Sequence, residues 1–162
     1  MAKLETKSVD FSINLTLYPD PNSYKWVTYE IIIGPRNGDK NLSLCLSYDE
    51  DQYFDACYDQ EVLSFCYGIE QVLKEEKDIF FFEPADQEDF QFIIRKKIMR
   101  DFEIIIYSDF FTIPKDYNCP SYICRGTSAT FTKEEILDFI SQLKKEYEEI
   151  ISKYPKDPNC TR

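Results

Sequence analysis

The sequence contains six cysteines and no histidine, which limits the chemistry that its side chains can carry out. Without an imidazole there is no Ser-His or Cys-His pair to activate a nucleophile. The four glycines are too far apart to form a phosphate-binding loop of either the nucleotide or the dinucleotide type. The remaining groups with reactive potential are thiols and carboxylates.

One pair of cysteines, Cys119 and Cys124, is close enough in sequence to offer two thiolates to one metal ion. A zinc site needs four ligands, and neither a second cysteine pair nor a histidine completes the set. Cys45 and Cys66 fall inside expected regular elements, where a reduced thiol packs as a small hydrophobic group. We therefore expect no metal and no cofactor, and the role of Cys119 and Cys124 stays open.

Carboxylates are densest between Tyr48 and Asp59. The run Asp49-Glu50-Asp51 lacks the spaced ligands, the glycine turn and the terminal glutamate of a calcium-binding loop. Catalysis by paired carboxylates requires one of them to be desolvated and raised in pKa, which acidity alone does not indicate. We expect the protein not to be an enzyme; a small enzyme that uses carboxylates or Cys119 and Cys124 is the less favoured alternative.

The same stretch suits binding to a protein, because its carboxylates are mixed with aromatic side chains. Carboxylates steer a basic partner, and neighbouring aromatic groups supply anchors that become buried in the complex. A similar acidic stretch lies between Phe82 and Phe90. For each residue, burial of the ring or simple solvation of the acid is the plainer interpretation. The residues predicted to contact a partner are Asp49, Glu50, Asp51, Tyr53, Asp55, Tyr58 and Asp59 in the first stretch and Glu83, Asp86, Glu88 and Asp89 in the second.

The composition is that of one acidic domain. The 162 residues are enough for one hydrophobic core, and 19 basic against 30 acidic side chains give a net charge of −11. Such a chain repels phosphate backbones, so we expect a basic protein partner and no direct contact with nucleic acid. Acidity that only improves solubility explains the charge equally well. The charge does not indicate an oligomeric state.

The N-terminal residues MAKLETKSVDF contain no apolar region typical of a secretion signal. No apolar run approaches the length that spans a bilayer. The expected location is therefore the bacterial cytoplasm, away from any membrane, where thiols stay reduced.

Alternation of apolar and polar residues predicts most of the strands. The pattern is clear from Ser8 to Tyr18 and from Trp26 to Ile33, and Leu42 to Tyr48 continues it as the third strand of a meander. Further strands are expected at 79–83, 90–94 and 102–107, with a turn at 96–101 and short strands near 121–125 and 128–131.

Two amphipathic helices complete the expected fold. Asp59 is suited to cap the first helix, whose apolar residues recur at helical spacing through Lys77. Thr132 and Glu135 form a capping box that begins the second helix, which Pro155 ends. The fold class is thus α+β: a mostly antiparallel sheet of about six or seven strands, with one helix between strands three and four and one C-terminal helix. A single domain spans 1–162, with an ordered core over 8–155 and a polar tail over 156–162.

Several short motifs follow these elements in order. They are Trp26-Val27 in the second strand, Leu63 and Val72-Leu73 in the first helix, Phe82-Glu83-Pro84, Phe90-Gln91-Phe92, and Phe139 to Tyr154-Pro155. This order resembles the WapI-type immunity proteins, small cytoplasmic partners of secreted bacterial polymorphic toxins. The resemblance covers about residues 9 to 155.

The resemblance implies a protein that binds and neutralises the nuclease domain of a toxin, protecting the producing cell. The net charge is independently compatible with this role, because nucleases are basic where they grip RNA or DNA. A phage- or plasmid-encoded acidic inhibitor that mimics nucleic acid and blocks a defence protein is the alternative. Neither the acidic stretch nor Cys119–Cys124 matches a motif of the family, so the resemblance does not assign the binding surface.

Overall fold

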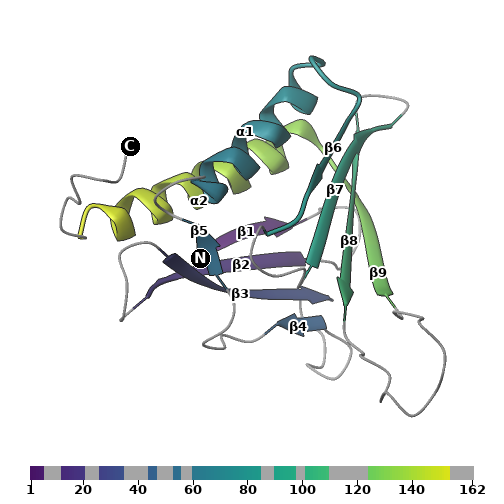
Figure 1. Ribbon diagram of the computed structural model, residues 1–162. Coiled ribbons are helices and arrows are strands. Elements are labelled where there is room, and N and C mark those ends of the chain that lie inside the picture. The colour runs from purple at the N-terminus through teal and green to yellow at the C-terminus, as the bar shows by residue number, and fades with distance from the viewer. Residues whose placement is uncertain are drawn as a thin grey trace, which may run out of the picture.

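The computed structural model describes residues 1–5, 12–20, 26–34, 44–46, 53–55, 60–84, 90–97, 101–109 and 124–153. These ranges contain nine strands, grouped in two antiparallel sheets, and two helices (Figure 1). The expected α+β class is confirmed. The strands are more numerous than expected and form two sheets rather than one, because pairing between neighbours in the chain stops at the first helix.

The first sheet contains β1 (Ala2–Glu5), β2 (Ser12–Pro19), β3 (Trp26–Gly34), β4 (Leu44–Leu46) and β5 (Tyr53–Asp55). β1 to β4 pair in sequence order, which confirms the meander expected for β2, β3 and β4. β5 pairs with the other end of β3. Neither β1 nor β5 was expected, since each is too short to establish an alternating pattern.

The second sheet contains β6 (Ile79–Phe82), β7 (Phe90–Lys96), β8 (Phe102–Asp109) and β9 (Cys124–Phe131), again in sequence order. β6, β7 and β8 lie where strands were expected, at 79–83, 90–94 and 102–107. The turn expected between β7 and β8 is confirmed by the Lys97 amide, which donates to the Asp101 carbonyl at 2.8 Å. The short strands expected near 121–125 and 128–131 are wrong: β9 is one strand that pairs with β8 along its whole length.

The first helix, α1 (Glu61–Leu73), begins one residue later than Asp59 would cap it. Its N-cap is Gln60, which has φ 47° and ψ 52° and makes no side-chain capping hydrogen bond. The prediction that Asp59 caps α1 is therefore wrong. Side-chain caps normally act from the extended backbone region, which Gln60 does not occupy.

α1 also ends earlier than the expected Lys77. Glu75 takes a left-handed conformation with φ 64°. The amides of Glu75 and Glu76 then donate to the carbonyls of Val72 and Gln71, at 3.1 and 2.9 Å. This pair of bonds is the Schellman ending of a helix, which turns the chain toward β6.

The second helix, α2 (Lys133–Ile151), begins with the predicted capping box. The Glu135 amide donates to the Thr132 hydroxyl at 3.3 Å, and the Thr132 amide donates to the Glu135 carboxylate at 2.8 Å. The expected apolar stripe is confirmed, because all of its members are buried: Ile136, Phe139, Ile140, Leu143, Tyr147 and Ile150.

The two helices lie side by side along one side of the molecule, over the first sheet and next to the second, and close one shared core (Figure 1). α2 packs against β1 and β2 of the first sheet, while α1 packs against β6 and β7 of the second and against β5. The Lys144 ammonium and the Glu70 carboxylate join the helices at 2.5 Å. Neither helix in the described part of the chain is long and apolar enough to cross a membrane.

Candidate functional site

The residues predicted to contact a partner fall on both sheets. Tyr53 and Asp55 lie in β5, opposite Thr28 and Trp26 of β3. Glu83 follows β6 in the second sheet, where its exposed carboxylate accepts a hydrogen bond from the Gln91 side-chain amide. The other predicted contact residues lie outside the described residues: Asp49, Glu50, Asp51, Tyr58, Asp59, Asp86, Glu88 and Asp89.

The second sheet presents an apolar row on the face opposite the core. Phe80 and Phe82 turn toward the core, so Phe81 between them turns away from it. The register places Phe81, Ile93 and Ile105 side by side across β6, β7 and β8. Phe81 at the edge is 56% exposed, whereas Ile93 in the middle is 8% exposed, so the row is most accessible at β6.

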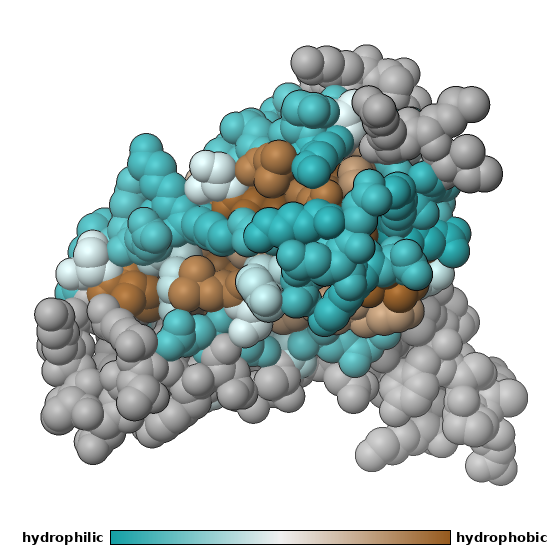
Figure 2. Space-filling view, turned by 90° about the horizontal axis from the view of Figure 1, so that it is seen from above, coloured by the Kyte–Doolittle hydropathy of each residue, from teal (hydrophilic) through white to brown (hydrophobic). Residues whose placement is uncertain are grey.

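Other exposed apolar side chains are dispersed. Figure 2 shows the molecule from the side on which the helices lie, and this face is mainly hydrophilic with small hydrophobic areas between. Tyr67 on α1 and Leu137 on α2 are 57% and 42% exposed, one on each helix. Isolated exposed apolar residues of this kind are normal on a protein surface. The exposed residues of β6 differ, because Ile79, which is 38% exposed, and Phe81 belong to the same strand.

The cations next to this row are engaged within the protein. Arg95 binds the Glu103 carboxylate at 2.6 Å, and Lys97 binds it at 3.3 Å. The hydrogen bond from Arg95, followed by that from Lys97, lowers the pKa of Glu103 against the opposing effect of burial. Lys96 pairs with Glu75 at 2.8 Å. The three consecutive cations Arg95, Lys96 and Lys97 are thus each paired with a neighbouring carboxylate.

Three carboxylates near β6 have no such ion pair in the described part of the chain. Glu76 and Asp78 precede the strand, and Glu83 follows it; all three are exposed. Within the described residues none of the three forms an ion pair. These carboxylates lie around the accessible end of the apolar row, and exposed Lys77 lies between Glu76 and Asp78. We call Ile79, Phe81, Glu76, Asp78 and Glu83 the β6 surface.

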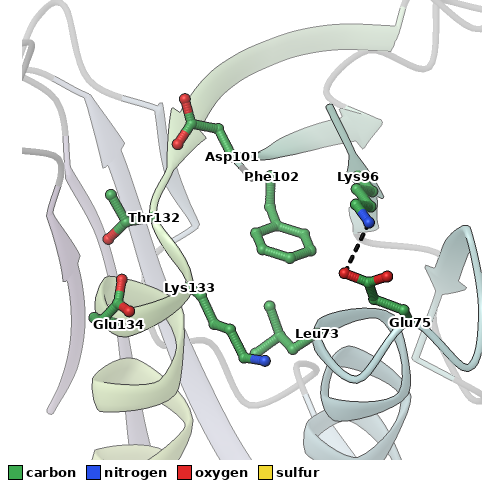
Figure 3. A pocket seen from close by; sticks show the side chains of 8 residues that line it. All are labelled: Leu73, Glu75, Lys96, Asp101, Phe102, Thr132, Lys133 and Glu134. Carbon is green, nitrogen blue, oxygen red and sulfur yellow. Dashed lines mark ion pairs between the residues drawn. The ribbon is translucent and has the colours of Figure 1, made fainter. Parts of the chain in front are cut away.

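A pocket of about 540 Å³ lies where the end of α1, the β7–β8 turn and the start of α2 meet (Figure 3). Leu73 and Phe102 form an apolar floor, and the Lys96–Glu75 ion pair borders one side (Figure 3). The Thr132 hydroxyl is already used as the cap of α2. The lining residues are Leu73, Glu75, Lys96, Asp101, Phe102, Thr132, Lys133 and Glu134. The pocket thus has opposite charges around an apolar floor at the junction of three elements. Its lining residues do not place a nucleophile beside a base.

The thiols and carboxylates that the structure describes form no metal-binding group of three or more side chains. Cys66 is completely buried, and burial raises the pKa of its thiol to about 12. It therefore packs as a small hydrophobic group, as expected. Cys124 begins β9, whereas Cys119 and the side chain of Cys45 lie outside what the structure describes.

Comparison with protein-family models and with curated proteins finds no match to this chain. Among solved structures, a chain described as "Crystal structures of trypanosoma bruciei MRP1/MRP2" is similar, with 10% sequence identity and a TM-score of 0.42. The similarity covers 85% of this chain and 84% of that one. At this TM-score the likeness supports no statement about fold or function.

Sequence reasoning did not single out Phe81. It identified residues 79–83 as an apolar strand, but three successive phenylalanines hide the alternation that separates the partly buried Phe80 and the buried Phe82 from the exposed Phe81. What separates them is the register with β7, which places Phe80 and Phe82 opposite the buried Ile94 and Phe92, and this register cannot be read from the sequence.

Proposed function

We propose that this protein is an immunity protein: a binding protein that neutralises a basic, nuclease-type bacterial toxin domain by occluding its surface. The observation that carries the proposal is the β6 surface, where exposed apolar side chains lie beside carboxylates without ion-pair partners. Carboxylates attract a basic domain over a distance, and the apolar groups hold the complex once water is excluded. The net charge of −11 favours the same kind of partner.

Solubility alone accounts less well for this arrangement. A surface selected only for solubility has mixed charges and few exposed large apolar groups. Here Phe81 is 56% exposed in the middle of an edge strand. An exposed side chain of this kind promotes aggregation of a protein that has no partner. It stabilises a complex when the partner buries it. The proposed setting is the cytoplasm of the bacterium that makes both proteins.

The test is a mixture of the purified protein with the toxin domain encoded beside its gene. We expect a stable complex of one copy of each, loss of the domain's nuclease activity in proportion to the protein added, and survival of cells that express both. A toxin domain that stays active in the presence of excess protein would contradict the proposal. A phage operon around the gene would instead favour the nucleic-acid mimic.

A further inference from the structure

One side of the β6 backbone has no strand partner among the described residues. β6 is at the end of the strand order of its sheet and pairs only with β7 in the described part of the chain. The Lys96 amide donates to the Asp78 carbonyl at 3.3 Å, so these two residues form a hydrogen-bonded pair. Antiparallel pairs alternate between bonded and non-bonded. Phe80 and Phe82 therefore direct their amides and carbonyls to β7, and Ile79 and Phe81 direct theirs away from it.

The open backbone groups and the exposed side chains belong to the same two residues. Ile79 and Phe81 are 38% and 56% exposed. On the opposite face of the strand, Phe80 packs against the core, so α1 covers the inner face and leaves the edge open. An added strand would find two sets of backbone partners, an apolar side chain beside each, and a carboxylate at either end.

We propose that the open edge of β6 binds an extended segment of the partner as a further strand of the second sheet. The segment recognised has apolar side chains that alternate with lysine or arginine. Its backbone bonds with Ile79 and Phe81, and its apolar side chains contact the same two residues. Its cations are on the other face of the sheet, to which Asp78 belongs. This mode of binding rests on the proposed function, since it describes how a basic partner engages the protein.

Charge selects this occupant over a second copy of the chain. Each copy carries a net charge of −11, so a second copy is repelled as it approaches. A basic segment replaces this repulsion with attraction.

Hydrogen exchange at single amides tests the proposal, because the register supplies its own control. In the free protein we expect the Ile79 and Phe81 amides to exchange quickly and the Phe80 and Phe82 amides to be protected. The probe is a capped peptide of alternating lysine and valine of about nine residues, within the ordinary length of a strand. At millimolar concentration it should slow exchange at Ile79 and Phe81 and leave Phe80 and Phe82 nearly unchanged.

Two matched controls separate pairing of strands from nonspecific attraction. The same peptide with methyl groups on alternate backbone nitrogens keeps its charge and apolar side chains, and we expect it to give no protection. Phe81→Lys should weaken binding of the unmodified peptide by about tenfold or more, since it removes an anchor and adds a repelling charge. Leu137→Lys makes the same change of charge at an exposed residue of α2 and should have a much smaller effect.

The cognate toxin domain distinguishes failure of this inference from failure of the proposed function. Binding of the domain with protection of Ile79 and Phe81 supports both. Binding without that protection overturns the edge inference and leaves the proposed function standing. Protection by the peptide with no binding of the toxin domain contradicts only the function. Absence of protection by the peptide, or dimers of the protein formed through β6, overturns the edge inference.

Discussion

At the scale of single residues, Glu75 occupies a backbone conformation that favours glycine, with φ 64° at the end of α1. A side chain with a Cβ pays about 1–2 kcal/mol for this conformation. The exposed ion pair with Lys96 offsets at most about 1 kcal/mol. Glycine also costs about 0.4–1 kcal/mol through the freedom that it adds to the unfolded chain. We therefore predict that Glu75→Gly leaves the free energy of unfolding about 1 kcal/mol higher than Glu76→Gly does, measured by urea denaturation.

The neighbouring residue is the control for this change. Glu76 is exposed and is not among the described residues with positive φ. Glu76→Gly should lower the free energy of unfolding by about 0.4–1 kcal/mol, because glycine gains freedom in the unfolded chain with no strain to relieve. Equal effects at both positions would show that the left-handed conformation of Glu75 is not strained.

Glu103 predicts a dependence of stability on pH. Its pKa in the folded protein is lowered, chiefly by the hydrogen bond from Arg95, so the folded state favours the ionised carboxylate. The resulting stability is present above the unfolded pKa of about 4.3 and is lost as the pH falls through the lower folded pKa. The difference in unfolding free energy between wild type and Glu103→Gln should therefore shrink in that acidic window.

Urea denaturation at a series of pH values measures this difference. Arg95→Gln removes the largest cause of the lowered pKa, so in that background Glu103→Gln should show a weaker dependence on pH. A difference that stays constant from neutral to strongly acidic pH would mean that Glu103 gains nothing from its neighbours.

At the scale of elements, α1 and β6 meet where Gly68 faces Phe80. A Cβ on Gly68 would overlap the ring of Phe80. Alanine favours a helix interior over glycine by about 1 kcal/mol, so Gly68→Ala tests which effect is larger. We predict that Gly68→Ala destabilises the protein, because the ring must move out of its contact with the core.

The sign of this effect should reverse when the ring is removed. In a Phe80→Ala background, Gly68→Ala should stabilise the protein by about 1 kcal/mol through helix propensity alone. The four variants form a double-mutant cycle, measured by urea denaturation. Stabilisation by Gly68→Ala in both backgrounds would mean that the ring yields without cost and that α1 is not fixed against β6 at this point.

The elements that depend on local signals were predictable from the sequence. β2 and β3 alternate over many residues, and α2 has both its capping box and its apolar stripe. The ends of α1 were not predictable from the sequence. Gln60 and Glu75 take left-handed conformations there, and neither is the glycine that usually marks such a position. The division into two sheets also escaped prediction, because no local pattern indicates that pairing between neighbouring strands stops at α1.

The candidate site shows the same limit. The acidic and aromatic composition indicated where a basic partner could be attracted, and Glu83 belongs to both the predicted set and the β6 surface. The open edge was not predictable, because an edge exists only once the order of strands is known. The exposure of Phe81 follows from register, which the run of phenylalanines conceals.

At the scale of the whole molecule, the distribution of acids decides which surface meets the partner. The first acidic stretch predicts that reversing Asp49, Asp51 and Asp55 to lysine weakens binding of the toxin domain, measured by calorimetry. The β6 surface predicts the same for reversal of Glu76, Asp78 and Glu83. Unchanged affinity in either triple variant moves the interface away from that stretch.

Neutral substitutions separate contact from long-range attraction. Charge accelerates association about 10- to 1000-fold when it faces the partner, and salt screens it beyond about 8 Å at physiological ionic strength. We predict that Glu76→Gln, Asp78→Asn and Glu83→Gln together slow association and flatten its dependence on salt, with a smaller change in dissociation.

The matched variant neutralises three exposed carboxylates farther along α2, Asp138, Glu148 and Glu149, and so has the same net charge. Stopped-flow association at several salt concentrations compares the two. If net charge alone steered the partner, both variants would slow equally. Because a charge near the contact acts within the screening length and a remote one does not, the β6 variant should lose more. Equal losses would make the acidity a property of the whole surface and leave β6 without a special part in recognition.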